Sequence, residues 1–438
     1  MFPVSCEQSH SALGGFLAPW PLSVLDVQAL RRTGLRSVPM RQFTLKVHSR
    51  CNLTCTYCYI YHGEDGSWRD HPPKVSAAVM RQTAHRIAEH ARTHGLGEVR
   101  VALHGGEPLL SGPGVLVDYV RTVRAALPAD CALRATVQSN GTLLTERALA
   151  LLAQEGIRVG LSLDGGTPAF NRRRVDHAGR PSWRRALRAA RLLARHPQSY
   201  AGLLCTIDVT ADPGEVYRSL AALRPPVLDL LLPHGNWSNP PPGLPVRAPE
   251  TARTGSRGAT PYGDWLAAAF DLWWGSRSGE GPPPRIRIFS EIIALLLGLP
   301  SALEAVGLSP TAAIVVETDG QIEQLDSLKQ TYEGAVVTGL DVFRNTFDES
   351  LDHPGVAARQ IGVAALGVTC RTCPVIAVCG GGNYAHRYRE GSGFRHPSVY
   401  CHDLERLIRH VAAALGPAIG GERPVPAVSA LPPMAMPD

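Results

Sequence analysis

Three cysteines, Cys51, Cys55 and Cys58, lie within eight residues of one another. They follow the apolar run FTLKV, which predicts a strand, so their thiols should lie in the loop at its carboxyl end. Thiolates are soft ligands that bind zinc or iron. A structural zinc site usually has four protein ligands, and no fourth partner is obvious here. The spacing therefore predicts a [4Fe-4S] cluster with one iron open to another ligand.

A second group of cysteines lies near the C-terminus and consists of Cys370, Cys373, Cys379 and Cys401. Four thiolates can hold an auxiliary [4Fe-4S] cluster or a structural zinc ion, and we predict the cluster. The chain has 10 cysteines and no export signal, a combination more typical of metal or redox chemistry than of disulfides. Cys131 and Cys205 fall in strand-like runs and are predicted to be small apolar core residues.

Strands and helices should alternate from Phe43 onward. Six apolar runs are separated by amphipathic stretches, and the runs are FTLKV, VRVAL, LRATV, RVGLSL, AGLLCTI and VLDLLL. This alternation predicts an α/β fold with a parallel sheet covered by helices, either open or closed into a barrel. In such folds the functional side chains lie at the carboxyl ends of the strands, where the first three cysteines stand.

The length of 438 residues and 44% hydrophobic content predict one large core with a smaller module. We expect five segments: an irregular arm at 1–40, the barrel at 41–235, a Pro-rich loop with bridging helices at 236–310, an auxiliary-cluster domain at 311–415 and a disordered tail at 416–438. No long apolar run or signal peptide is evident, so we expect a soluble cytoplasmic protein without membrane contact. We attribute the net charge of +6 to arginines spread along helices, which gives little reason to expect nucleic-acid binding.

The motifs at the strand ends resemble the radical S-adenosylmethionine (SAM) superfamily. The pattern C-x-x-x-C-x-x-C contains an aromatic residue before its last cysteine, and LHGGEPLL, VQSNGTLL and LSLDGG follow the second, third and fourth strands. The resemblance implies a partial (βα)6 TIM-like barrel. It also implies an enzyme in which the cluster donates one electron to SAM, giving a 5′-deoxyadenosyl radical that abstracts a hydrogen atom.

The same resemblance assigns residues to the parts of SAM. It implies that Gly105, Gly106 and Glu107 bind the methionyl amine and that Ser162 and Arg174 bind the carboxylate. It further implies that Asn140 and Asp164 lie on the ribose and substrate side, and that Tyr57 belongs to the cluster loop. Arg172 and Arg173 adjoin Arg174, so the choice among the three stays open. A solvated basic loop is the alternative.

The C-terminal segment CRTCPVIAVCGGGNYAHRYREGSGFRHPSVYC resembles the SPASM domain, an iron-sulfur module of peptide-modifying radical SAM enzymes. It departs from that pattern twice. Asn383 stands where a further cysteine is usual, and Leu325 follows Gly320 at the position of another. The resemblance therefore implies one auxiliary [4Fe-4S] cluster, held by the four C-terminal cysteines.

Two side chains are candidates for contact with a substrate. Asp326 stands where related sulfatase-maturating enzymes carry a catalytic base, and an aspartate in a surface turn is the alternative. His234 follows the sixth strand and could line the substrate opening, with an ordinary loop as the alternative.

Longer phrases, including VHSRCNLTCTYCYIY, NRRRVDHAGRPSW, LLLPHGNW and VETDGQIEQLDSLK, resemble FxsB-type peptide maturases over roughly residues 43–410. This resemblance implies a cyclophane crosslink between an aromatic ring and a side-chain β-carbon of a ribosomally synthesised precursor peptide. The expected electron donor is a flavodoxin or ferredoxin. Other SPASM chemistry (thioether or formylglycine formation), a non-catalytic peptide-binding scaffold and a zinc-stabilised binding protein are the alternatives.

Overall fold

The computed structural model describes residues 20–244, 259–276 and 282–418. It contains the predicted alternation of strands and helices. The first six strands are β1 (Gln42–His48), β2 (Glu98–Gly105), β3 (Ala132–Ser139), β4 (Arg158–Ser162), β5 (Tyr200–Thr206) and β6 (Val227–Leu231). The helices between them are α2 (Ala77–Thr93), α3 (Pro113–Ala126), α4 (Glu146–Gln154), α5 (Trp183–Arg195) and α6 (Pro213–Ala221).

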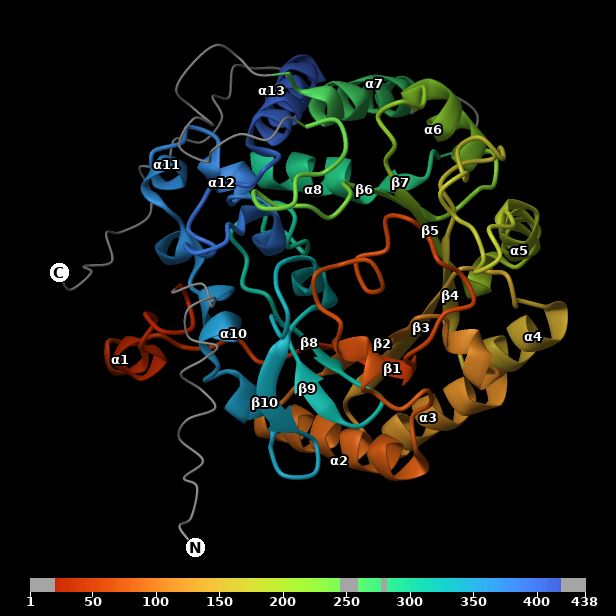
Figure 1. The fold of residues 1–438 in the computed structure, drawn as a ribbon, viewed down its shortest axis with the longest axis vertical. Helices are drawn as coiled ribbons and strands as arrows, with labels where there is room; N and C mark the ends of the chain where they lie inside the picture. Colours follow the sequence, from red (N-terminus) through yellow and green to blue (C-terminus); the bar gives the residue numbers. More distant parts are fainter. Residues whose placement is uncertain (1–19, 245–258, 277–281, 419–438) are drawn as a thin grey trace, which may run out of the picture.

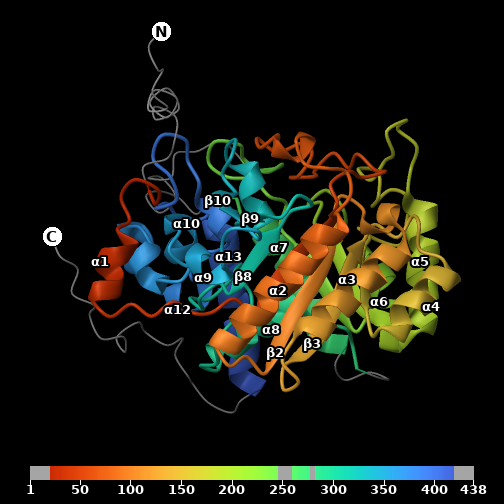
Figure 2. The same ribbon diagram turned by 90° about the horizontal axis from the view of Figure 1, so that it is seen from below.

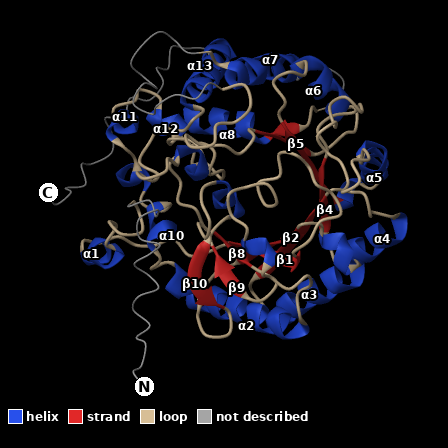
Figure 3. Cartoon of the chain, viewed as in Figure 1, coloured by secondary structure: helices blue, strands red, loops and turns tan. Residues whose placement is uncertain are grey.

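These six strands are hydrogen-bonded in chain order, and every neighbouring pair is parallel. They form an arc with the helices on its outer side, as Figures 1 and 3 show. Covered strands need apolar side chains, which explains why the sequence shows near-continuous apolar runs. The arrangement is the expected partial barrel, and Cys131 and Cys205 belong to its core as predicted.

The sheet continues beyond the six-stranded arc at both edges, next to β6 and next to β1. The short strand β7 (Arg285–Ile286) pairs with β6, while β8 (Ala313–Val316) pairs in parallel with β1. From β8 the chain turns back through β9 (Gln321–Glu323) and β10 (Val337–Asp341), which are antiparallel. The sheet therefore crosses the boundary predicted at residue 311, because the pairing of β8 with β1 joins segments far apart in the sequence.

The C-terminal region covers the open side of the arc (Figure 1). Its helices are α7 (Pro261–Gly275), α8 (Arg287–Leu296), α9 (Phe347–Ser350), α10 (Pro354–Ala358), α11 (Val368–Arg371), α12 (Ile376–Cys379) and α13 (Cys401–Ala418). The Asp403 side chain at the start of α13 accepts hydrogen bonds of 2.8 Å from the backbone amides of Tyr262 and Gly263 in α7. One continuous apolar core runs from Met40 to Val411, so the barrel and the C-terminal region pack as one body.

Two predicted terminal segments are described only in part. Residues 1–19 of the arm lie outside the described ranges, and its remainder contains the helix α1 (Val27–Arg32). Residues 416–418 belong to α13, and the rest of the predicted tail lies outside the described ranges. Within those ranges, no helix combines the length and apolar character needed to cross a bilayer.

The loops that follow the carboxyl ends of the strands gather at one end of the molecule. Figure 2 shows this end at the top, where the loop after β1, drawn in orange, lies above the strands. The cysteine loop, the turn after β2 and the segment between β4 and α5 meet there. The fold therefore assembles the predicted site from segments separated by about one βα unit each.

Candidate functional site

The cysteine loop after β1 forms one wall of a cavity of about 470 Å³. Cys51, Cys55 and Cys58 all line this cavity. Burial is the main cause of the raised pKa values of all three thiols. The pKa of Cys51 is raised to about 12, and the neighbouring thiols of Cys55 and Cys58 contribute to this increase. Three thiols around one cavity fit a cluster that binds them as thiolates and displaces their protons.

The turn after β2 packs directly against the start of the cysteine loop. The amide of Gly106 donates to the carbonyl of His48 over 2.8 Å, and the amide of Glu107 donates to the carbonyl of Arg50 over 3.1 Å. A Cβ atom on Gly105 would lie 2.2 Å from the carbonyl oxygen of His48, and one on Gly106 would lie 2.4 Å from that of Arg50. Both positions therefore require glycine, and both residues line the cavity.

Glu107 lies behind the cavity wall and is 0% exposed. Its carboxylate accepts hydrogen bonds from the Leu109 amide (3.1 Å), the Ser139 hydroxyl (2.8 Å) and the Asn140 amide (2.7 Å). These contacts fix the turn after β3, from which Ser139 and Asn140 line the cavity. In this structure Glu107 positions that turn, and its direct contact with the SAM amine stays a prediction.

Of the three neighbouring arginines, Arg174 lines the cavity, and it is 4% exposed. One of its guanidinium nitrogens donates to the Tyr57 hydroxyl over 2.7 Å, and that hydroxyl donates to Asp164 over 2.6 Å. Its Nε has no hydrogen-bond partner among the described residues. Burial disfavours the charge of Arg174, but Tyr57 and Asp164 outweigh burial and raise its pKa. A charged guanidinium with one unsatisfied donor suits a carboxylate ligand.

Arg172 and Arg173 lie elsewhere. Both pair with Asp208, at 2.6 Å and 3.6 Å respectively. Neither lines the cavity. The structure thus separates three arginines that the sequence could not distinguish.

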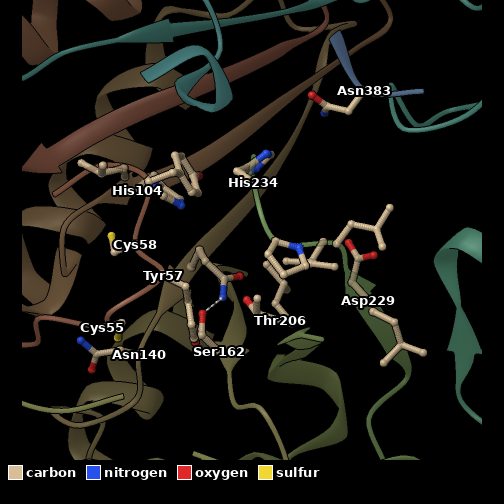
Figure 4. Close-up of a pocket in the computed structure, with 18 of the residues that line it drawn as sticks. Cys55, Tyr57, Cys58, His104, Asn140, Ser162, Thr206, Asp229, His234 and Asn383 are labelled. Atoms are coloured by element: carbon tan, nitrogen blue, oxygen red, sulfur yellow. Dashed lines mark hydrogen bonds between the residues drawn. The ribbon is translucent and has the colours of Figure 1, made fainter. Parts of the chain in front are cut away.

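Ser162 lies at the end of β4 and lines the cavity near Arg174. Its hydroxyl accepts a hydrogen bond of 2.9 Å from Gln138, drawn as a dashed line in Figure 4. Gln138 also lines the cavity, and sequence reasoning missed it. Its place one residue before the end of β3, beside the recognised SNG phrase, is the signal that could have indicated it. Ser162 and Arg174 both line the cavity, and their shared contact with the SAM carboxylate stays a prediction.

The opposite side of the cavity carries Asp229, His234 and Asn383, as Figure 4 shows. His234 therefore lines the cavity, in agreement with its interpretation as a residue of the substrate opening and not of an ordinary loop. Its Nδ1 lies 3.1 Å from Nε2 of His386, and burial lowers the pKa of His234 to about 4 and that of His386 well below normal. The apolar side chains of this half are Leu230, Leu231, Leu232, Ile288, Leu303, Ala305 and Leu404. This half offers space and polar contacts to a molecule other than SAM.

Asp326 is buried, so its interpretation as a surface-turn aspartate is wrong. It is 8% exposed and its Oδ2 lies 2.7 Å from the ammonium of Lys46 on β1. Burial acts to raise its pKa, but Lys46 and Lys329 outweigh burial and hold the pKa below its usual value. Its Oδ1 has no hydrogen-bond partner among the described residues. Asp326 is not one of the cavity-lining residues, and its role as a base stays a prediction.

The four C-terminal cysteines, Cys370, Cys373, Cys379 and Cys401, line one small cavity in the C-terminal region. Burial raises the pKa of Cys379 to about 12, with further contributions from Cys370 and Cys373. Burial also raises the pKa of Cys401, at the start of α13, and the other three thiols contribute to this increase. The four cysteines therefore line the same cavity, which suits the thiolate ligands of one iron-sulfur cluster.

Protein contacts fill the position of the missing auxiliary ligand. The Asn383 side chain donates to Glu304 over 3.4 Å and accepts from the Ala385 amide over 3.0 Å. Glu304 in turn accepts from Arg359 over 2.6 Å. Asn383 is thus integrated into a polar network, consistent with a single auxiliary centre in this chain.

The sequence of residues 45–223 matches the Radical SAM superfamily. The Klebsiella aerogenes serine-type anaerobic sulfatase-maturating enzyme is 28% identical over 209 residues, which span 46% of this chain and 50% of that relative. The Klebsiella pneumoniae serine-type enzyme is 24% identical over 406 residues, 90% of this chain and 94% of the relative. The cysteine-type enzyme of Clostridium perfringens (strain 13 / Type A) is 26% identical over 292 residues, 66% and 74% of the two chains.

Solved structures show the same architecture. The enzyme anSMEcpe with bound AdoMet superposes with a TM-score of 0.70 at 22% identity, covering 85% of this chain and 98% of that one. Streptococcus suis SuiB bound to its precursor peptide SuiA gives a TM-score of 0.54 at 13% identity, covering 86% and 79%. The chain therefore has the radical SAM α/β fold, and its residues 45–223 are similar in sequence to the Radical SAM superfamily. Radical SAM proteins bind a [4Fe-4S] cluster and SAM, and AdoMet is bound in the similar anSMEcpe structure, which bears out the cofactor prediction for the barrel.

Proposed function

We propose that this protein uses SAM to oxidise the β-carbon of a side chain in a bound peptide. The observation that carries the proposal is the single cavity that joins the cysteine loop, Ser162 and Arg174 to the half that contains His234 and Asn383. Such a cavity can hold SAM at the cluster and a second molecule beside it. The solved structures of anSMEcpe with the Cp18Cys peptide and of SuiB with its precursor peptide SuiA contain peptides bound to similar folds.

Bound SAM and the cluster would supply the 5′-deoxyadenosyl radical that removes one hydrogen atom. The chain's own residues bind and orient the reactants. Arg174 and Ser162 would hold the SAM carboxylate, while the backbone of Gly105 and Gly106 approaches the amine. The apolar half of the cavity would limit the access of water. Its contacts with the peptide would hold one C–H bond at the reacting centre.

The relatives favour formylglycine as the product, made from a serine or cysteine of the peptide. From serine, that reaction removes a hydrogen atom from the β-carbon, a proton from the hydroxyl and one further electron. From cysteine, the same three losses give a thioaldehyde, which water then hydrolyses to formylglycine with release of hydrogen sulfide. Asp326 is the proposed acceptor of the proton, because Lys46 keeps its carboxylate charged and its Oδ1 has no partner among the described residues. Since Asp326 does not line the cavity, the proton would reach it through an intervening group. The auxiliary cluster on the four C-terminal cysteines is the proposed acceptor of the electron.

A cyclophane crosslink is the second candidate. It begins with the same hydrogen abstraction, but the β-carbon radical then bonds to an aromatic ring. The ring regains its aromaticity by losing a proton and one electron, and the auxiliary cluster is again the proposed acceptor of that electron. The observation that favours it is the departure from the cysteine pattern at Leu325 and Asn383. Asn383 contacts Glu304 at the position where a further cysteine is usual. In both cases a flavodoxin or ferredoxin is the proposed electron donor.

The test offers the reconstituted protein two kinds of peptide with SAM and reductant. One contains a serine or cysteine and no aromatic residue, and the other contains an aromatic residue near a residue with a β-CH₂ group. Mass spectrometry with hydrazide labelling separates the outcomes. Serine oxidation and crosslinking both remove two hydrogens, but only formylglycine reacts with the hydrazide, and only the crosslink blocks backbone fragmentation within the ring.

The Cys58→Ala variant is the control and should give no product from either peptide. A hydrazide-reactive product supports the first candidate, and an unreactive cyclic product supports the second. If the wild type cleaves SAM but modifies neither peptide, the proposal of a peptide substrate is wrong.

A further inference from the structure

The positive charge of the chain is concentrated in one segment. Residues 171–195 contain nine arginines, one aspartate and no lysine or glutamate, a net charge of +8. The whole chain carries +6, so all other residues together are net −2. The interpretation that the charge is spread along several helices is therefore wrong. This segment comprises the loop after β4 and the whole of α5.

The arginines of α5 form one exposed face. Arg184, Arg188, Arg191 and Arg195 lie at helical spacings of four, seven and eleven residues, and all four are exposed. The opposite face, with Ala186, Leu187, Ala190, Leu193 and their neighbours, is buried against the barrel. Arg195 pairs with Glu146, whereas no carboxylate among the described residues pairs with the other three. These three line a surface hollow, and with Arg180 we call them the basic face.

The segment that carries the basic face is bonded to the cysteine loop. The amide of Thr54 donates to the carbonyl of Val175 over 2.8 Å. The ring of His177 lies 2.9 Å from the carbonyl of Cys51. The chain then turns through Arg180, whose side chain is 78% exposed, and enters α5. The basic face thus continues from the outer side of the cluster loop, away from the cavity.

We propose that the basic face docks an acidic protein that delivers the electron to the cluster in the barrel. The inference rests on the proposed function, because radical chemistry needs one electron for each SAM cleaved. That electron leaves the reduced donor, which is oxidised by one electron, and reduces the cluster; no bond forms or breaks. A donor protein is too large for the cavity, so it must approach the cluster loop from outside, where the unpaired arginines lie. Arg180 pairs with Asp176 over 2.9 Å, but Arg184, Arg188 and Arg191 lie together without a carboxylate partner among the described residues, which favours an anionic partner.

The test measures cluster reduction directly, without peptide. Reduced flavodoxin is mixed with the reconstituted protein in a stopped-flow instrument, and flavodoxin oxidation is followed at several salt concentrations. We expect the Arg184→Glu/Arg188→Glu variant to be reduced at least about 10-fold more slowly than the wild type at low salt. The difference should shrink toward high salt, because screening at about 0.1 M already acts over roughly 10 Å.

Two controls make the result specific. Arg92→Glu changes an equally exposed arginine at the end of α2 and should leave the rate unchanged. Photoreduced deazaflavin, a small donor that needs no docking face, should reduce wild type and variant equally, which shows that the variant is folded and loaded.

Equal rates for variant and wild type with flavodoxin at every salt concentration would overturn the proposal. So would a variant that loses affinity for an acidic precursor peptide while flavodoxin reduces it normally, because the face would then belong to the peptide. If flavodoxin reduction is slowed as expected but no peptide is modified by the wild type, the docking face stands and the proposed peptide substrate fails.

Discussion

At the scale of single residues, the site depends on charged groups that are buried and paired. Arg174 is held by Tyr57 and Asp164, and Asp326 is held by Lys46. Each charge would be costly alone in the interior, so each needs its partner to stay charged. The orphaned Nε of Arg174 and Oδ1 of Asp326 are the atoms left for a ligand or a proton.

Arg174→Lys should weaken SAM binding by at least about 10-fold. Lysine keeps the charge but loses the planar fork that reaches both Tyr57 and a carboxylate. Equilibrium binding of SAM to the reconstituted protein measures the effect. Arg173→Lys is the matched control, because Arg173 pairs with Asp208 outside the cavity and should bind SAM as the wild type does. Weaker binding in both variants, or in neither, would contradict the assignment of Arg174.

Asp326→Asn should lower the free energy of unfolding by about 3 kcal/mol, because it leaves the Lys46 ammonium buried without its counterion. Urea unfolding measures the loss. Adding Lys46→Met should restore most of it, since the double variant contains neither buried charge. The control Glu146→Gln removes an exposed partner of Arg195 and should cost less than about 1 kcal/mol. An Asp326→Asn variant as stable as the wild type would show that the pair is not buried as described.

At the scale of elements, the hairpin of β8 and β9 is tied to the cysteine loop by buried charges. His71, in the segment that follows this loop, lies 2.9 Å from Asp319 and 3.5 Å from Glu323. Lys329 lies 3.2 Å from both Glu317 and Glu323. This network fixes the β8–β9 hairpin beside β1, where it extends the barrel sheet.

His71→Gln should destabilise the protein more at pH 6 than at pH 10. Burial opposes the charge of His71, but Asp319, Glu323 and Glu317 outweigh burial and raise its pKa from 6.5 to about 10. A raised pKa gives stability that is complete below about pH 6.5 and is lost as the pH rises through about 10. Urea midpoints of wild type and variant at several pH values test this. A difference that grows with pH would contradict the charged state of His71.

Sequence reasoning succeeded where the determinants are local. The spacing of the three cysteines lies within one loop, and the glycines after β2 mark a turn whose backbone touches its neighbour. It could not choose Arg174 over Arg173, because the two differ only in the direction that the folded loop gives them. The burial of Asp326 depends on Lys46, which is 280 residues away in the chain. The pairing of β8 with β1 is equally non-local.

At the scale of the whole molecule, the barrel and the C-terminal region share one core and one cavity. Glu304, Asn383 and His386 of the later segments face the cavity together with the cysteine loop. The four C-terminal cysteines lie in a separate small cavity within the same body. The two predicted metal centres therefore lie in one folded unit. The basic face of α5 lies on the outer side of the loop that carries Cys51, Cys55 and Cys58.

The most direct test measures iron, sulfide and electron paramagnetic resonance of the anaerobically reconstituted protein after reduction, with and without SAM. The wild type is compared with a Cys51→Ala/Cys55→Ala/Cys58→Ala variant. We predict about eight irons per chain in the wild type and about four in the variant, for two [4Fe-4S] clusters and one. A signal that changes on SAM addition should appear only in the wild type. Equal iron in both proteins, or a wild-type signal indifferent to SAM, would contradict the assignment of the SAM-binding cluster to these three cysteines.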